Sequence, residues 1–495
     1  MAVLTCADGP EAARSPFSRP NSRCELGHSA GPGPWPRPRR AESPKVRGGI
    51  GAFRGAVSFA ASRQPPPVNA ARRTMRKILV VGAGQSGLQL ALGLLAEDYD
   101  VTLVNPQGPE EIRTGRVLST QCLFGPALRR ERRHGLDLWG DRAPRITGVG
   151  VRVAGQGGGA APDLDWVGRL DEPARSVDQR LKLAAWLELF VRGGGRVLRR
   201  RVAAGELAEL GAGHDLVIVA AGRGELSELF PRGEGRSPFR EPQRALSLAY
   251  VTGAEPPPGG GVLGRTVVPG AGELFTLPTL SLNGVCQALM VEAVPGGPLD
   301  RPLGRGATGE DVLAGLLDVL RVHAPWEYER FSRARLADPM AALYGGYTPV
   351  VRQPVARLAD GTLVLGMADS VVSNDPVTAQ GANMASLCAD VYRRAVVDHG
   401  GRPFDEAFMR AAFAAYWRHA RQVTAWSRVM LSGPHHVWEL YRLAERHQPT
   451  ADRFANSFSE PIGLIDWFLH PERAIEYADA VRRTLPTRSS HVPIS

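Results

Sequence analysis

The sequence predicts an α/β protein in which a parallel sheet is combined with a second, mainly antiparallel layer and with C-terminal helices. The first observation is a strand–helix–strand unit of about 30 residues, which runs from the strand Lys77–Val81 to the strand Asp100–Val104. The second is a group of short, turn-bounded strand candidates between residues 240 and 350. The third is a mostly helical pattern over residues 404–484.

The parallel layer is predicted from apolar runs that alternate with helical patterns. Lys77–Val81 is almost continuously apolar, as expected of a parallel strand buried on both faces. Further strands are predicted over Gly195–Arg201, Asp215–Ala220 and Leu363–Leu365, and helices over Leu88–Glu97, Val177–Arg192 and Ala379–Val397.

The second layer is predicted from four short segments bounded by turn residues. These are Ala245–Thr252, Arg265–Val268, Glu273–Pro278 and Val285–Val294. A helix is predicted over Glu310–His323, with Thr308 as its N-cap.

The turn after the first strand has the spacing of a dinucleotide-binding motif, Gly82-Ala83-Gly84-Gln85-Ser86-Gly87. Gly82 allows the tight turn, Gly84 lets the backbone approach a pyrophosphate, and Gly87 lets helix pack on strand. Gln85 and Ser86 are predicted to contact the cofactor with them. The motif follows a strand and opens a helix, which is the context that gives it meaning.

The end of the second strand, where an acidic residue usually holds the ribose, has Asn105 instead. An Asn side chain still hydrogen-bonds a hydroxyl, so Asn105 is predicted to contact the cofactor. The choice of dinucleotide needs other evidence.

A second element lies after the strand Leu363–Leu365. Asp369 follows that strand, and Pro376 leads into Gln380-Gly381-Ala382-Asn383-Met384. This strand–loop–helix resembles that of the FAD-dependent aromatic hydroxylase superfamily. The resemblance implies that Asp369 binds a ribityl hydroxyl and that the helix N-terminus stabilises negative charge on the flavin pyrimidine. Gly115-Arg116 resembles the element of that superfamily whose Arg lies over the diphosphate or flavin.

Longer blocks resemble the FAD-dependent epoxidase component of the styrene/indole monooxygenase family. These blocks are Pro173–Leu181, Pro242–Leu246, Gly272–Glu292 and Asp375–Ser386. The resemblance covers nearly all of the chain after Met75. It implies an FAD-binding Rossmann-like domain of the aromatic-hydroxylase type, an antiparallel substrate domain and C-terminal helices.

Members of that family receive FADH2 from a separate NADH-dependent flavin reductase. Single-component hydroxylases have an Asp-Gly element where this chain has Ala221-Gly222. The glycine of this element is present, so Gly222 is predicted to contact FAD. Its Asp is absent, so no NAD(P)H site is expected. The family resemblance also suggests a homodimer.

Six positions align with the family's substrate pocket, and five of them resemble the indole-type branch, while Leu123 is a near neighbour of that branch's Met. They are Ser119, Gln121, Leu123, Ile146, Val149 and Ala174. Alternation along a strand would place the first three on one face. The resemblance implies that reduced FAD reacts with O2 at C4a to form a hydroperoxide, which epoxidises indole, styrene or a similar small aromatic alkene.

Two alternatives stay open at this point. A flavin-dependent halogenase would need a catalytic Lys and a Trp-x-Trp-x-Ile-Pro motif, and the motif is absent from the sequence. A non-oxygenating flavoprotein, such as a reductase or saturase, would share the glycine motif and Asp369 but not the Gly272–Glu292 block.

The domain organisation follows from these assignments. Residues 75–240 and 350–400 are predicted to bind FAD, 241–349 to form the substrate-binding sheet, and 401–495 to be helical. Residues 1–74 are rich in Pro, Gly, Arg and Ser, and are predicted to be a disordered leader or a non-native extension.

Composition excludes several function classes. Of the net charge of +10, eight charges lie in residues 1–74, so a basic nucleic-acid surface on the folded part is not expected. No apolar run reaches the roughly 18 residues of a membrane span. The cysteines at 6, 24, 122, 286 and 388 form no metal or disulfide pattern, which favours the reducing cytoplasm.

Overall fold

A computed structural model describes residues 75–485, except 156–158, 258 and 304–305. The predictions for residues 1–74 and 486–495 therefore lie outside the described residues.

The glycine motif directly follows β1, a central strand of a six-stranded sheet. The strand order of this sheet is β14-β15-β6-β1-β2-β5. Five of its strands are parallel, and the edge strand β14 is antiparallel to β15. The strands are β1 (Lys77–Val81), β2 (Asp100–Val104), β5 (Arg196–Leu198), β6 (Leu216–Val219), β14 (Val355–Arg357) and β15 (Leu363–Gly366). The predicted parallel layer is confirmed.

Besides α10 (Glu406–Ser432), three helices pack in the apolar core around this sheet. They are α1 (Gln85–Leu95), α4 (Gln179–Arg192) and α9 (Gly381–His399). Asp178 caps α4 by accepting a hydrogen bond from the Arg180 backbone N–H. Helix α9 begins two residues later than predicted because Ala379 has a left-handed φ of 52° and cannot continue a helix.

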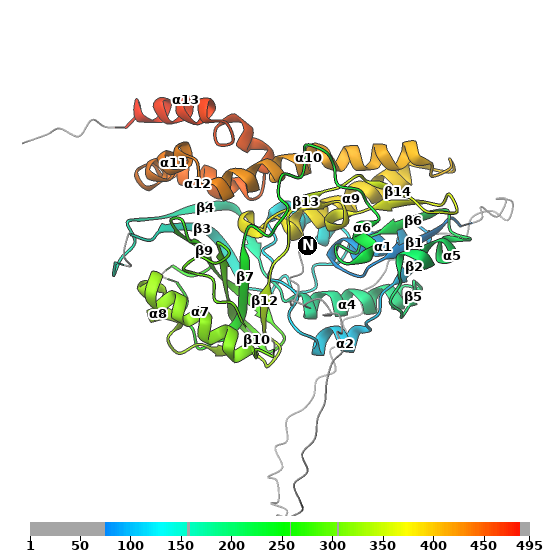
Figure 1. Cartoon of the computed structure of the whole chain (residues 1–495), viewed down its shortest axis with the longest axis horizontal. Helices are drawn as coiled ribbons and strands as arrows, with labels where there is room; N and C mark the ends of the chain where they lie inside the picture. The colour runs from blue at the N-terminus through cyan, green and yellow to red at the C-terminus, as the bar shows by residue number, and fades with distance from the viewer. Residues whose placement is uncertain (1–74, 156–158, 258, 304–305, 486–495) are drawn as a thin grey trace, which may run out of the picture. The chain divides into compact units, whose positions relative to one another are not determined.

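The second sheet has eight strands in the order β11-β7-β10-β9-β8-β3-β4, and β12 also pairs with β7 (Figure 1). Its pairs are antiparallel except β3 with β8. The strands are β3 (Arg145–Val153), β4 (Leu164–Arg175), β7 (Ala245–Thr252), β8 (Val262–Val268), β9 (Gly272–Ser281), β10 (Gly284–Ala293), β11 (Arg335–Leu336) and β12 (Ala342–Gly345). Because β3 and β4 complete this sheet, the predicted boundary at residue 240 does not follow the sheet boundary.

Helices pack on both faces of the antiparallel sheet. Helix α7 (Gly309–His323) packs on β7 and β10, and Thr308 caps it as predicted. Helix α8 (Pro325–Phe331) packs beside α7. The other face meets α11 (His435–Arg446) and α12 (Gln448–Ser457), which contact β4. Figure 1 shows the two helical layers on opposite sides of the strands.

The remaining elements are short or C-terminal. They are α2 (Pro109–Thr114), α3 (Gly125–Arg133), α5 (Leu207–Gly211), α6 (Glu225–Glu228), α10 (Glu406–Ser432), α13 (Pro471–Arg482), β13 (Val350–Val351) and β16 (Val372–Ser373). The mainly helical character predicted for residues 404–484 is confirmed. No helix in the described part of the chain has both the length and the apolar character that a bilayer crossing requires.

Gly168 provides a test of how α12 docks on β4. A Cβ at Gly168 would lie 2.0 Å from the Ala451 carbonyl oxygen of α12. We expect Gly168→Ala to lower the free energy of unfolding by about 1–3 kcal/mol, because the helix must move off the sheet. Chemical denaturation measures the change.

The matched control is Gly205→Ala, since a Cβ at this exposed glycine meets no atom within 4 Å. Equal stability of the two variants would contradict the observed packing of α12 on β4.

Candidate functional site

The glycine turn is held by close backbone contacts. Gly82 has a φ of +116°, and a Cβ there would lie 2.9 Å from the Ala220 carbonyl carbon at the end of β6. A Cβ at Gly87 would lie 1.9 Å from the Gly82 oxygen. At Gly84 the same construction meets nothing within 4 Å. The turn is therefore packed tightly on its inner side and open on its outer side.

A cavity of about 450 Å³ lies over this open side. It is the place where the carboxyl ends of β1, β2, β6 and β15 meet, which is where open parallel sheets bind ligands. The predicted cofactor residues in its wall are Gly82, Gly84, Gln85, Ser86, Asn105, Gly222 and Asp369. Gly222 and Asp369 touch closely, since a Cβ at Gly222 would lie 2.6 Å from the Asp369 Cβ.

A buried ion pair between Glu131 and Lys182 contacts the glycine turn through the Gln85 side chain. The Gln85 Nε2 donates to Glu131 Oε1 at 3.1 Å, and Lys182 Nζ lies 2.8 Å from the same oxygen. Burial raises the pKa of Glu131, and the Lys182 ammonium opposes this shift. The Gln85 side chain is thus anchored in the core, and its backbone lies at the helix N-terminus that faces the cavity.

Two guanidinium groups in the same wall, Arg223 and Arg352, were missed from the sequence. Arg223 directly follows Gly222, and Arg352 follows β13. Together with the N-terminus of α1 they give the cavity the donors that a diphosphate requires. Arg116, the arginine selected from the sequence, is exposed and contributes to the wall of neither this cavity nor the next.

A second, largely apolar cavity of about 70 Å³ adjoins the first. The predicted residues Ser119, Gln121, Pro376, Gly381 and Ala382 lie in its wall. The remaining wall comes mainly from the inner face of the antiparallel sheet, with Leu246, Leu263, Phe275, Leu277 and Met290. The two cavities share Tyr347, whose hydroxyl donates to the Asn374 carbonyl oxygen.

The predicted strand through Ser119, Gln121 and Leu123 is wrong. The segment forms no strand and only an isolated bridge at Leu123, so alternation does not govern it. Four consecutive residues, Ser119 to Cys122, line the cavity. Leu123 instead packs with Ala127, Leu128 and Ala382.

The other three predicted pocket residues lie behind the wall. Ile146 and Ala174 face each other across β3 and β4, and Val149 pairs with Leu263. All three are fully buried in the apolar cluster that contains the cavity wall, but they do not line the cavity.

The start of α9 combines backbone strain with anchored side chains. Asn383 accepts from Phe124 N–H at 3.0 Å and donates to the Cys122 oxygen at 2.9 Å. Gln380 donates to the Phe458 oxygen at 3.0 Å, and Met384 packs in the core. These side chains position the helix, and the backbone at Gly381 and Ala382 faces the cavity.

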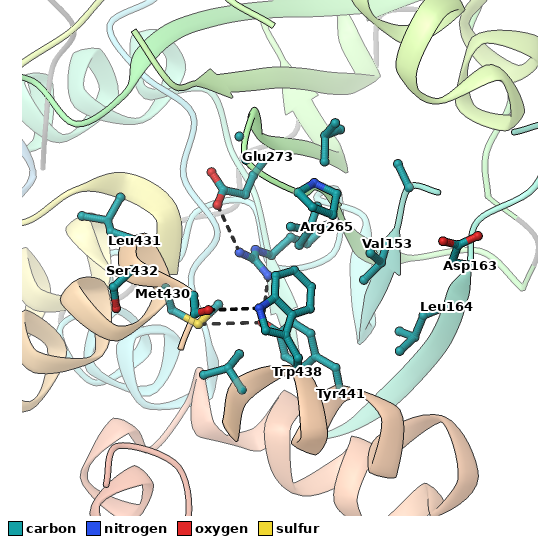
Figure 2. A pocket seen from close by; sticks show the side chains of 18 of the residues that line it. Val153, Asp163, Leu164, Arg265, Glu273, Met430, Leu431, Ser432, Trp438 and Tyr441 are labelled. Atoms are coloured by element: carbon teal, nitrogen blue, oxygen red, sulfur yellow. Dashed lines mark hydrogen bonds and ion pairs between the residues drawn. The ribbon is translucent and has the colours of Figure 1, made fainter. Parts of the chain in front are cut away.

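A larger cavity of about 820 Å³ continues along the same sheet face, away from the glycine turn. At its inner end Arg265 and Glu273 point toward one another, and Trp438 and Tyr441 of α11 lie opposite (Figure 2). Its wall mixes apolar side chains with the charged groups of Arg244, Arg265 and Glu273.

Among the described residues, no group of three or more His, Cys, Asp or Glu side chains is arranged to hold a metal ion. Cys122, Cys286 and Cys388 are buried free thiols. Cys6 and Cys24 lie outside the described residues.

The chain is similar to known proteins over most of its length. Residues 222–330 match the family model described as "Styrene monooxygenase A putative substrate binding domain". The chain is 30% identical to styrene monooxygenase StyA of Pseudomonas fluorescens over 425 residues, which is 83% of this chain and 99% of that protein.

Solved structures with low sequence identity share the fold. A flavoprotein/dehydrogenase from Cytophaga hutchinsonii has a TM-score of 0.57 at 12% identity, covering 83% of this chain and 99% of its own. The flavin-dependent brominase Bmp2 has a TM-score of 0.55 at 15% identity, covering 82% of this chain and 100% of its own.

Gly84 offers a direct test of the cavity over the turn. A methyl group there would enter the cavity without touching protein atoms. We expect Gly84→Ala to weaken FAD binding at least about tenfold, a loss of ~1.4 kcal/mol, while the thermal midpoint stays near that of the wild type. Calorimetric titration with FAD measures the affinity, and unchanged affinity would contradict the placement of the diphosphate.

Proposed function

This chain belongs to the styrene monooxygenase family, and we propose that it is the FAD-dependent oxygenase component of a two-component system. In this proposal a separate NADH-dependent flavin reductase supplies reduced FAD, and the substrate is a small aromatic alkene. When bound, reduced FAD activates O2 so that one oxygen atom is transferred to the alkene and the other leaves as water.

The observation that carries the proposal is the pair of adjoining cavities. One has the glycine turn, Asp369 and two guanidinium groups, which suit the diphosphate and ribityl chain of FAD. The other is apolar and lies against the start of α9. Tyr347 borders both cavities, so a flavin ring seated between them would meet the substrate at that residue.

The chain's own residues then act mainly by positioning and by excluding water. The aliphatic and aromatic wall of the smaller cavity keeps water from the reacting oxygen. The N-terminus of α9, which faces the apolar cavity at Gly381, would stabilise negative charge on a bound reduced flavin. Burial raises the pKa of Tyr347 well above its ordinary value, so the hydroxyl at the junction stays protonated.

Gln121 favours indole over styrene. Its Nε2 donates to the Val177 oxygen at 2.7 Å, which fixes the amide, and its Oε1 has no hydrogen-bond partner among the described residues. Gln121 is 4% exposed and lines the apolar cavity. An indole N–H would satisfy this acceptor, whereas styrene has no donor to offer, so the buried oxygen would remain unpaired.

The brominase with the same fold raises the alternative of halogenation, which the lysines of this chain do not favour. Lys182 is held by Glu131 beneath the glycine turn, and Lys77 begins β1. Neither lines the apolar cavity. The third lysine, Lys45, lies outside the described residues.

The homodimer and the cytoplasmic location suggested by the sequence stay predictions. Size-exclusion chromatography with light scattering tests the first, and localisation of a tagged full-length chain tests the second.

Oxygen transfer by the wild-type chain is the primary test of the function. With FAD, NADH and a flavin reductase, we expect indole and styrene to gain one oxygen atom from labelled O2, with indole preferred. Gln121→Leu is expected to lower kcat/KM for indole relative to styrene by about 10–100-fold, because one hydrogen bond of ~1.4–2.8 kcal/mol is lost.

Leu123→Met is the control, because Leu123 lies outside the cavity wall and should leave the substrate ratio unchanged. An equal ratio in Gln121→Leu and the wild type would contradict the role of Gln121. Oxidation of NADH by the purified chain alone would contradict the two-component proposal.

A further inference from the structure

Two sequence blocks that resemble the epoxidase component contain charged residues that the proposed function has not used. Arg244 lies in the first block, and Glu273 and Glu292 lie in the second. The structure places all three at one end of the inner face of the antiparallel sheet. Glu273 accepts from Arg244 Nε at 2.8 Å and from its NH2 at 3.1 Å.

Glu292 lies between the apolar cavity and the larger cavity. On β10 it is two residues from Met290, which lines the apolar cavity, and alternation puts both on one face. Glu292 is opposite Leu246 of β7 on one side and opposite Glu273 of β9 on the other. Leu246 lines the apolar cavity and Glu273 lines the larger one.

Asp375 approaches the same place from the loop before α9. Its neighbours Asn374 and Pro376 both line the apolar cavity. Asp375 is 3% exposed, and its Oδ1 accepts from the Val377 N–H at 3.2 Å. The two carboxyl groups thus come from different elements, and each is within two residues of a residue that lines the apolar cavity.

The surroundings of Glu292 do not suit a charged carboxylate. The side chain is 0% exposed, and neither carboxyl oxygen has a hydrogen-bond partner among the described residues. Burial raises the pKa of Glu292 well above its ordinary value, and the charges of Asp375 and Glu273 raise it further. Burial also raises the pKa of Asp375 to about 7, against the attraction of Arg244.

The balance of charges in this buried cluster also indicates that one carboxyl group is protonated. The cluster contains two guanidinium groups, Arg244 and Arg265, and three carboxyl groups. One bound proton makes this buried group neutral, which avoids the cost of an unpaired charge. Other titratable or charged groups near the pair are Tyr347, Tyr441, Arg236 and Arg428.

The larger cavity gives this cluster a route to solvent. Arg244, Arg265 and Glu273 all belong to its wall, and it is wide enough at about 820 Å³ to hold many waters. Arg265 donates to the Tyr441 hydroxyl at 2.8 Å across the inner end. Water in this cavity can therefore reach Glu273, which is opposite Glu292 on the neighbouring strand, without passing through the apolar cavity.

Resting on the proposed function, we propose that Glu292 and Asp375 together hold one transferable proton, supply it toward the oxygen atom that leaves as water, and regain it from solvent through Glu273 and the larger cavity. Neither carboxyl group lines the apolar cavity, so both act through intervening groups and do not touch the reacting atoms.

The stoichiometry balances for reduced flavin bound as its anion. The flavin supplies two electrons and one proton, and the carboxyl pair supplies the second proton. One atom of O2 forms two C–O bonds at the alkene, and the other forms two O–H bonds and leaves as water. After the transfer the carboxyl pair has one additional negative charge. A proton from solvent then replaces the proton that was transferred.

The proton can be observed in the flavin-free protein. The infrared spectrum is recorded from about pH 5 to about pH 9. The difference between the spectra of the wild type and of Glu292→Gln should show the carbonyl band of the protonated Glu292 carboxyl group. The band should weaken only as the pH rises well above the ordinary range of a glutamate, because burial and the charges of Asp375 and Glu273 raise the pKa of Glu292. Asp375→Asn should shift that transition, because it removes the charge that is coupled to Glu292.

The same variants should change the pH profile of oxygen transfer. In the wild type the rate should fall about tenfold per pH unit once the shared proton is lost. Glu292→Gln should reduce the rate of oxygen transfer at neutral pH about tenfold or more. It should also remove the decrease of the rate with rising pH. Glu292→Asp, which keeps a carboxyl group, should restore this decrease with a shifted midpoint.

Glu327→Gln is the matched control. Glu327 of α8 is 2% exposed but pairs with Arg152 and Arg330, so its loss should leave the band and the pH profile unchanged. Variants of Glu292 that keep the wild-type pH profile would overturn the inference, whether or not their stability changes. A wild-type chain that oxygenates no alkene would instead overturn the proposed function, while the infrared titration would still show where the proton resides.

Discussion

The close approach of the turn after β1 to the end of β6 is the constraint on which the site depends. Gly82 and Gly87 leave no room for a Cβ, so β1, β6 and α1 meet at backbone distance. This contact fixes the N-terminus of α1 at the carboxyl edge of the parallel sheet. Asn105, Gly222 and Asp369 reach the same edge because their strands are parallel to β1. A site for a long cofactor is therefore assembled from segments far apart in the sequence.

The antiparallel sheet contributes the second half of the site through one continuous face. Leu263, Phe275 and Met290 make that face apolar at the smaller cavity, and Arg265, Glu273 and Glu292 make it charged further along the same strands. A period of two along each strand keeps both sets on one side. The apolar part excludes water from oxygen transfer, and the charged part lies within reach of solvent. The boundary between them is where a proton would have to cross.

The sequence predicts the parallel layer well because its signals are local. Lys77–Val81 and Asp100–Val104 have the observed bounds, and Gly82, Gly84 and Asp369 meet at one cavity because a glycine turn and parallel strands dictate it. The pocket residues are harder to predict, because they depend on the path of an irregular segment. Ser119 and Gln121 line the cavity, but Leu123 turns away to pair with Arg175. Tyr347 and Arg352 have no sequence signal at all, since only the fold brings them to the cavity over the glycine turn.

The central claim is that a flavin lies with its diphosphate over the glycine turn and its ring at the start of α9. Hydrogen–deuterium exchange with and without FAD tests both contacts at once in the wild-type chain. The account predicts slower amide exchange at residues 84–87 and 381–384 together, with little change at residues 309–323 of α7. A folded preparation in which FAD slows exchange in neither segment would contradict it.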